Sequence, residues 1–90
     1  MDSAKEINDR IATLTHDIEN VVDGFTPGGD TISELYFERA KLYYRSGRNS
    51  EALNDFLKVV QLDPANTEAR EYEHQIREIF DYRYMDYYNP

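Results

Sequence analysis

The sequence predicts an all-α protein of about four helices joined by short connections. Apolar residues recur three or four positions apart along most of the 90-residue chain, which is the spacing of one helical face. Two apolar stretches begin with a capping box, Ser3-x-x-Glu6 and Thr31-x-x-Glu34, in which the hydroxyl and the carboxylate each satisfy a free backbone N–H. Glycine and proline fall between the stretches, so we expect antiparallel helical hairpins in a single domain, residues 1–90.

The first predicted helix spans residues 3–23 and carries one apolar stripe. The stripe consists of Ile7, Ile11, Leu14, Ile18 and Val21 with Val22. Residues 24–30 contain three glycines and a proline, which allow positive φ or fix φ. We therefore expect a Gly-rich loop over residues 24–30.

The second predicted helix follows Thr31 and is apolar over more than half of its circumference. Ile32, Tyr36, Ala40 and Tyr43 share one face, flanked by Leu35 and Leu42 on one side and by Phe37 and Tyr44 on the other. Such a helix is contacted from two directions. Gly47 closes it, since glycine adopts the left-handed conformation at a helix end without steric cost.

The third predicted helix stops before Pro64, whose ring disfavours a helical residue before it. Its apolar positions are Ala52, Leu53, Phe56, Val59, Val60 and Leu62. A fourth helix over residues 67–80 can be capped by Asn66 or Thr67. Its apolar stripe is Ala69, Tyr72, Ile76, Ile79 and Phe80.

Residues 33–66 resemble a tetratricopeptide repeat (TPR). An aromatic residue, a small residue and a tyrosine occur at the spacing of the repeat, and Ala-x3-Phe and a closing proline follow them. The positions that correspond to the repeat core are Tyr36, Ala40, Tyr43, Gly47, Ala52, Phe56, Val59 and Pro64. In this family each repeat is a pair of antiparallel helices that stacks on its neighbours and leaves a concave, protein-binding surface. The resemblance therefore implies a short right-handed solenoid of about four helices.

The chain departs from the family pattern at Arg39, where leucine is usual. Burying a guanidinium without a partner is costly, so we expect Arg39 to be paired or to lie at an edge where the stack ends. Residues 17–22 also resemble residues 55–60, in the pattern Asp-apolar-x-x-Val-Val. By this resemblance the first helix is the second half of a preceding repeat, and residues 67–80 form a capping helix. The chain also resembles small bacterial single-repeat TPR proteins with a Tyr-rich C-terminus.

Composition and charge argue against several classes of function. The chain has 10 basic and 18 acidic residues, and its formal net charge of −8 repels nucleic acid and anionic lipid at long range. It lacks cysteine, which excludes disulfides and thiolate metal sites. No apolar run approaches the roughly 18 residues of a membrane span, and the N-terminus lacks the features of a secretion signal. We therefore expect a soluble cytoplasmic protein with neither a nucleic-acid nor a membrane partner.

Candidate catalytic residues are few. His16 and His74 lie on different predicted helices, and neither has a nucleophile motif near it. His74 and Glu78 stand four residues apart on one helical face, but two ligands are too few for a metal site. We therefore predict no enzymatic activity, no cofactor and no metal site.

By the TPR resemblance, a partner binds in a groove lined by the first helix of each repeat. The residues that this places in the groove are Glu34, Phe37, Lys41, Tyr44 and Arg45, joined by Glu71 and Gln75 of the fourth helix. Lys41 and Arg45 beside two aromatic rings suit an acidic or aromatic peptide end. We therefore predict an adapter that binds a peptide or a partner protein. The alternative for Phe37 and Tyr44 is packing on the first helix.

Residues 81–90 are too rich in aromatic side chains for a disordered tail that makes no contacts. The tyrosines available for docking are Tyr82, Tyr84, Tyr87 and Tyr88. One interpretation extends the fourth helix, so that Phe80, Tyr84 and Tyr87 lie on one face over the core. The other docks the segment as a ligand in the groove of its own chain or of a second copy. A second copy would make the chain a homodimer and a self-associating structural or assembly subunit.

Overall fold

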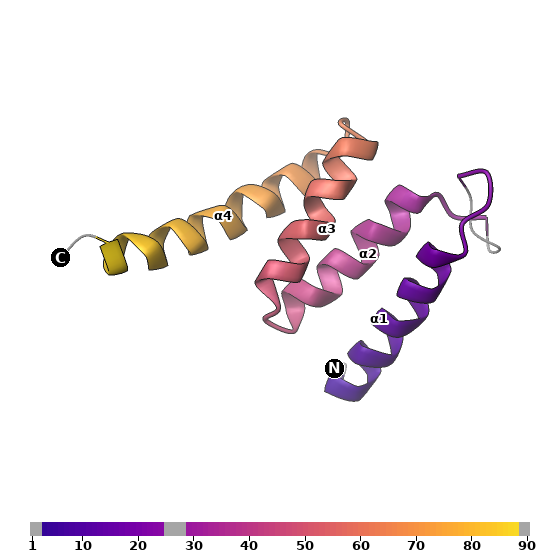
Figure 1. Cartoon of the computed structure of the whole chain (residues 1–90), viewed down its shortest axis with the longest axis horizontal. Coiled ribbons are helices and arrows are strands. Elements are labelled where there is room, and N and C mark those ends of the chain that lie inside the picture. Colours follow the sequence, from indigo (N-terminus) through magenta and orange to yellow (C-terminus); the bar gives the residue numbers. More distant parts are fainter. Residues whose placement is uncertain (1–2, 25–28, 89–90) are drawn as a thin grey trace.

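The computed structural model describes residues 3–24 and 29–88, with side chains described up to Asp81. This part contains four α-helices: α1 (Ala4–Glu19), α2 (Ile32–Arg45), α3 (Asn49–Leu62) and α4 (Thr67–Tyr88). Helix α2 lies between α1 and α3, and α4 packs against α3 (Figure 1). The all-α prediction is confirmed. None of the described helices has the length and apolar character needed to cross a membrane.

Three helices begin at side-chain caps that the sequence predicts. Ser3 Oγ and Thr31 Oγ1 each accept a hydrogen bond from the backbone N–H three residues further on, at 3.1 and 3.3 Å. Asn66 Oδ1 accepts one from the Ala69 N–H at 3.0 Å, so Asn66 caps α4. Each cap stabilises its helix by about 1 kcal/mol, because it satisfies an N–H that the helix leaves free.

Helix α1 ends at Glu19 and not near Asp23, so the predicted boundary is wrong. The Asn20 side chain donates to the His16 carbonyl at 2.7 Å, and the Asn20 N–H donates to the same carbonyl at 3.1 Å. These bonds close the last turn, and Val22 lies outside the helix with 69% of its surface exposed. The resemblance between residues 17–22 and 55–60 therefore does not extend to the two valines.

The turn between α2 and α3 is the glycine turn that the sequence predicts. Gly47 has a φ of +79°, in the left-handed region. The Arg48 N–H donates to the Tyr43 carbonyl at 2.8 Å, and the Gly47 N–H donates to the Tyr44 carbonyl at 3.1 Å. This pair of bonds is a Schellman motif, and it turns the chain directly into an antiparallel hairpin.

Two apolar clusters form the interior. The larger cluster joins α2, α3 and α4 through Ala40, Ala52, Phe56, Val59, Ala69 and Ile76. The smaller cluster joins α1 and α2 through Ile11, Leu14, Leu35 and Leu42. Complete burial of Phe56 alone contributes about 1.5–3 kcal/mol. Of the remaining predicted core residues, Tyr36 and Tyr43 pack against the larger cluster, and Pro64 is exposed in the α3–α4 turn.

The alternative that Phe37 and Tyr44 pack on α1 is wrong. Leu35 and Leu42 occupy the face of α2 toward α1. Phe37 and Tyr44 stand two residues further along, a rotation of about 200° about the helix axis. They pack against the larger cluster, which α3 and α4 share. Helix α2 therefore has an aromatic face toward α4.

Arg39 is paired, and it links three helices. Its Nε and Nη2 atoms donate to the two carboxylate oxygens of Asp55 on α3, at 2.7 and 2.8 Å. Its Nη1 atom donates to Thr15 Oγ1 on α1 at 3.0 Å. The hydrogen bonds that Arg39 donates to Asp55 raise the pKa of Arg39, against the opposing effect of burial. Only 15% of the Arg39 side chain and 7% of the Asp55 side chain are exposed, so both charged groups are largely shielded from solvent.

The side of α4 that faces away from α3 is charged. Arg70, His74 and Arg77 occupy, one predicted repeat length later, the positions of Tyr36, Ala40 and Tyr43. All three side chains are exposed, whereas Ala69 and Ile76 are buried on the α3 side. Arg77 and His74 pair with Glu73 and Glu78 on α4 itself, and a further helix stacked here would have to take these charged groups out of water, which is costly. Helix α4 is therefore the polar end of the stack.

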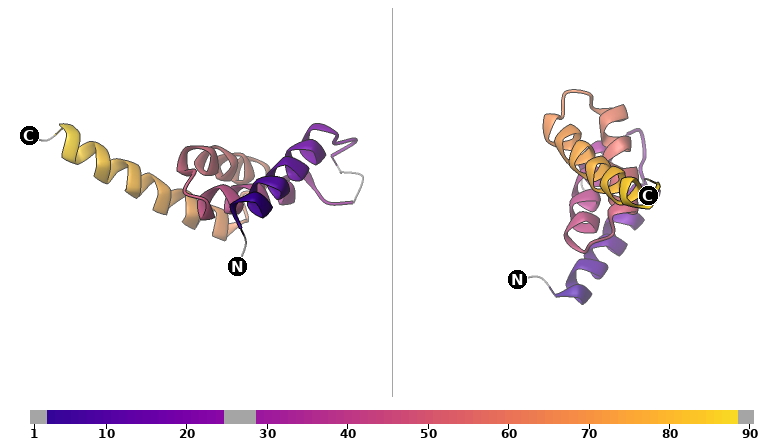
Figure 2. Two further views of the ribbon diagram at one scale, coloured as in Figure 1. Left: turned by 90° about the horizontal axis from the view of Figure 1, so that it is seen from below. Right: turned by 90° about the vertical axis from the view of Figure 1, so that its left-hand side faces the viewer.

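Helix α4 continues past Phe80, where the predicted helix ended, to Tyr88. The backbone of residues 81–88 is therefore helical, which agrees with the interpretation that the tail extends the fourth helix. Figures 1 and 2 show this part of α4 projecting away from α1, α2 and α3, so it does not lie over the core. The side chains of the tail tyrosines, Tyr82, Tyr84, Tyr87 and Tyr88, and residues 89–90 lie outside the described part of the chain.

Candidate partner-binding groove

Aromatic rings from three helices meet beneath the face of α2 that the sequence assigns to partner binding. The rings of Phe56 and Tyr72 are stacked, with centroids 4.7 Å apart and planes 6° from parallel. Phe37 meets Phe56 edge-on at 6.0 Å and Tyr72 at 6.4 Å. Tyr44 meets Tyr72 edge-on at 5.4 Å. Aromatic pairs in these geometries contribute about 0.5–1.5 kcal/mol each beyond their buried area, so they fix the spacing of α2 and α4.

Lys41 lies directly above this aromatic layer. Its Nζ atom is 4.4 Å from the centroid of the Phe37 ring, within the range of a cation–π interaction. The side chain is half-buried. Among the described residues, no carboxylate forms an ion pair with Lys41. The ammonium group is therefore held in place by a ring and is not neutralised by an anion of the described chain.

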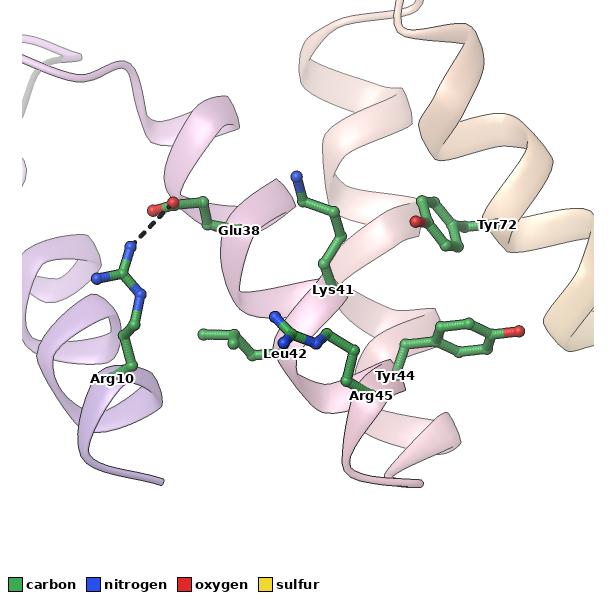
Figure 3. Close-up of a pocket in the computed structure, with 7 residues that line it drawn as sticks. All are labelled: Arg10, Glu38, Lys41, Leu42, Tyr44, Arg45 and Tyr72. Carbon is green, nitrogen blue, oxygen red and sulfur yellow. Dashed lines mark hydrogen bonds and ion pairs between the residues drawn. The ribbon is translucent and has the colours of Figure 1, made fainter. Parts of the chain in front are cut away.

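The cationic hollow is a depression of about 240 Å³ around Lys41. It is lined by Arg10, Glu38, Lys41, Leu42, Tyr44, Arg45 and Tyr72. Figure 3 shows Lys41 and Arg45 on α2, between Arg10 of α1 and Tyr72 of α4. The Arg10 Nη2 atom is 3.1 Å from Glu38 Oε1, so this pair joins the α1 wall to α2. The hollow thus combines three cations, one carboxylate and two tyrosine rings.

Three further depressions lie around α2 and α4, and two of them share residues with the cationic hollow. The α1 hollow, about 510 Å³, is lined by Arg10, Asp30, Glu34, Leu35, Phe37 and Glu38. The α3 hollow, about 370 Å³, is lined by Thr31, Ser33, Glu34, Phe37, Leu62, Asp63 and Asn66. The α4 hollow, about 260 Å³, is lined by Glu68, Glu71, Tyr72 and Gln75.

The four hollows are linked by lining residues that neighbouring ones share. The cationic hollow shares Arg10 and Glu38 with the α1 hollow, and Tyr72 with the α4 hollow. The α1 hollow shares Glu34 and Phe37 with the α3 hollow. We call the four together the groove. Its lining residues come mainly from α2, and the others come from α1, α3, α4 and the segments that flank these helices.

All seven residues that the sequence assigns to partner binding line the groove. Glu34, Phe37, Lys41, Tyr44 and Arg45 contribute from α2, and Glu71 and Gln75 contribute from α4. Phe37 and Tyr44 also pack against the core, so they belong to the groove and to the interior at once. The binding role of these residues stays a prediction.

Sequence reasoning did not assign several other groove residues, among them Arg10, Tyr72 and Leu62. Arg10 lies outside the apolar stripe predicted for the first helix, and nothing in its local pattern indicates that it faces Glu38. Tyr72 was predicted to belong to an apolar stripe, and its position between two hollows follows only from the crossing of α2 and α4. Leu62 was expected on the apolar side of α3 but is 45% exposed and lines the α3 hollow. Its place as the last residue of α3 was the available signal.

The described histidines take part in local contacts. The His74 Nε2 atom is 3.1 Å from Glu78 Oε1, and both side chains are exposed on α4. Within the described part of the chain, no three histidine, aspartate or glutamate side chains lie close enough to hold a metal ion. The absence of catalytic activity stays a prediction.

Comparison with known proteins gives one match. Residues 33–66 match a family model described as "Tetratricopeptide repeat". This match has the same bounds as the resemblance read from the sequence, and it covers α2 and α3 with the turns that flank them. Neither the curated proteins nor the solved structures yield a match.

Proposed function

Because this chain is a tetratricopeptide repeat protein whose repeat spans residues 33–66, we propose that it acts by binding and not by catalysis. Its ligand is a peptide or an exposed segment of a partner protein, held in the groove between α1, α2 and α4. The proposed binding function requires no cofactor.

The observation that carries the proposal is the position of Lys41. The ammonium group sits on the Phe37 ring and faces the cationic hollow, with no described carboxylate paired to it. A half-buried cation gains more from an anionic partner than an exposed one, because water screens the attraction less. A carboxylate of a bound peptide would supply that anion, while an apolar or aromatic side chain would rest on Phe37 and Tyr72.

The charged outer face of α4 further supports the groove as the binding surface. TPR stacks use helix faces for neighbouring repeats and leave the groove for other proteins. Arg70 and Arg77 are exposed on the outer face, where burial under a neighbouring helix would be costly. The groove, in contrast, presents aromatic rings, a cation and adjoining depressions in one surface.

The test measures peptide binding by the full chain, with a charge-reversed variant and a matched control. Lys41→Glu removes the cation of the groove, whereas Lys58→Glu makes the same charge change on an exposed position of α3 that lines none of the four hollows. We expect peptides selected by the wild-type chain to lose about tenfold in affinity with Lys41→Glu and to keep it with Lys58→Glu. Equal effects of the two variants would count against the groove.

A second candidate function is self-assembly through the end of α4. The observation that favours it is the projection of residues 81–88 beyond Phe80, which among the described side chains of α4 is the last that packs against the core. This segment is rich in tyrosine, and apolar helices that project from a body are stabilised by a partner. Light scattering of the full chain and of a version ending at Phe80 tests it. A dimer that becomes a monomer on truncation would support self-assembly, and two monomers would exclude it.

A further inference from the structure

The cations of the groove are concentrated in one hollow. Arg10, Lys41 and Arg45 all line the cationic hollow, and only Arg10 among them also lines a second one. Arg10 is already paired with Glu38 at 3.1 Å. Lys41, held on the Phe37 ring and paired with no described carboxylate, is placed to hold the carboxylate of a ligand.

The rest of the groove is acidic. The other three hollows are lined by Asp30, Glu34, Glu38, Asp63, Glu68 and Glu71. Among the described residues, only Glu38 of these six forms an ion pair. The groove thus has a cationic centre with carboxylates on both sides of it, toward the N-terminal end of α2 and along α4.

The spacing of these charges sets a pattern for the ligand. Glu34 and Lys41 are seven residues apart on α2, a separation of about 10 Å at the rise of an α-helix. An extended peptide covers that distance in about three residues. Since the screening length is about 8 Å at physiological salt, a ligand charge at one site is attracted mainly by the groove residues nearest to it.

On the basis of the binding function proposed above, we propose that the groove selects an extended peptide with one carboxylate at Lys41 and a lysine or arginine about three residues away. The basic residue lies beside Glu34 when it is on one side of the carboxylate, and beside Glu71 when it is on the other. A uniformly acidic peptide is rejected, because it places like charges against the flanking carboxylates and because the whole chain carries a net charge of −8.

The experiment presents three pools of synthetic peptides of about seven residues to the immobilised full chain, a length that covers three residues on either side of the carboxylate. Every peptide has aspartate at its centre. The two positions that lie three residues before and three residues after this aspartate are fixed, and all other positions are random. The two fixed positions are lysine in the first pool, serine in the second and glutamate in the third. A fully random pool serves as the reference. Retained peptides are counted by sequencing or mass spectrometry at low and at high salt.

We expect the lysine pool to be retained about tenfold more than the glutamate pool at low salt, with the serine pool between them and the difference reduced at high salt. Retention of the glutamate pool at or above the lysine pool, lost in Lys41→Glu, would overturn the charge pattern and leave the binding function standing. No retention from any pool, the random reference included, would overturn both.

Two variants test the flanking carboxylates. Glu71→Lys and Glu34→Gln each alter one flank, and both positions are exposed, so the fold tolerates the changes. We expect each variant to lower the preference for the lysine pool over the glutamate pool by at least about threefold. Glu19→Lys makes the same charge change as Glu71→Lys at an exposed position that lines none of the four hollows. A control that lowers the preference as much as the test variants would show a net-charge effect and would overturn the proposed pattern.

Discussion

Arg39 on α2 and Asp55 on α3 form a two-point ion pair inside the repeat, with Nε–Oδ2 and Nη2–Oδ1 distances of 2.7 and 2.8 Å. The family usually places leucine where Arg39 stands. The pair therefore replaces an apolar contact between the two helices with a charged one, and Thr15 extends it to α1. Thr15 Oγ1 in turn donates to the Ile11 carbonyl at 2.8 Å, so each polar group of the network has a partner.

Removing one member of this pair should destabilise the chain strongly. Asp55→Ala leaves a partly buried guanidinium without its carboxylate, and we expect the free energy of unfolding to fall by about 2–4 kcal/mol. Glu38→Ala is the matched control, since the Arg10–Glu38 pair has a similar distance but is exposed, and it should cost at most about 1 kcal/mol. Urea unfolding measures both. Similar losses in the two variants would mean that burial does not set the strength of the Arg39 pair.

Replacing both members with apolar residues should restore stability. Arg39→Leu with Asp55→Leu removes the buried charges together, and we expect the double variant to lie within about 1 kcal/mol of the wild-type chain. Double-mutant analysis of the urea midpoints checks this. A double variant as unstable as Asp55→Ala would indicate that the network, and not only charge balance, is required for packing.

Ala52 should not tolerate a larger side chain. Ala40 and Ala52 are both fully buried where α2 and α3 approach each other. We expect Ala52→Leu to destabilise the chain by about 1–3 kcal/mol, because the helices must separate to admit it. Ala12→Leu, at an exposed position of α1, is the control and should leave the melting temperature nearly unchanged. An unchanged melting temperature for Ala52→Leu would contradict the close approach of the helices.

Gly47 should resist substitution for a conformational reason. Its φ of +79° is costly for a residue with a Cβ atom, although the space around it is open. We expect Gly47→Ala to destabilise by about 1–2 kcal/mol and Gly47→Asn by less, since asparagine adopts left-handed backbone more readily. Thermal unfolding of the two variants ranks them. The reverse order would argue against the backbone as the cause.

The stacked rings of Phe56 and Tyr72 should be coupled energetically. Tyr72→Leu and Phe56→Leu each remove one ring of the stack between α3 and α4. We expect the double variant to lose about 0.5–1.5 kcal/mol less than the sum of the single variants. Additive losses would mean that the stack contributes only through buried area.

Local chemistry in the sequence predicted most of the fold. Ser3, Thr31 and Gly47 act through bonds to residues at most five positions away, so their roles can be recognised in a short stretch of sequence. The end of α1 was missed because Val22 continues an apolar period that the bonds made by Asn20 interrupt. Periodicity records which residues are apolar, but it does not record where a helix stops.

The candidate site was predictable only in part. Lys41 and Phe37 are four residues apart on one helix, so their contact follows from helical geometry. Asp55 and Arg10 contact α2 from other helices, and their places depend on how those helices cross. The need of Arg39 for a partner was clear from the sequence, but the identity of that partner required the packing of the hairpin.

The charged outer face of α4 also limits how copies of this chain can assemble. A head-to-tail contact between the two ends of a helical stack repeats from copy to copy, and it gives an open filament wherever the rotation does not close into a ring. Arg70, His74 and Arg77 occupy the face that such a contact would have to bury. Any assembly of this chain must therefore use another surface, and a two-fold pairing that uses the same patch on both copies would stop at the dimer.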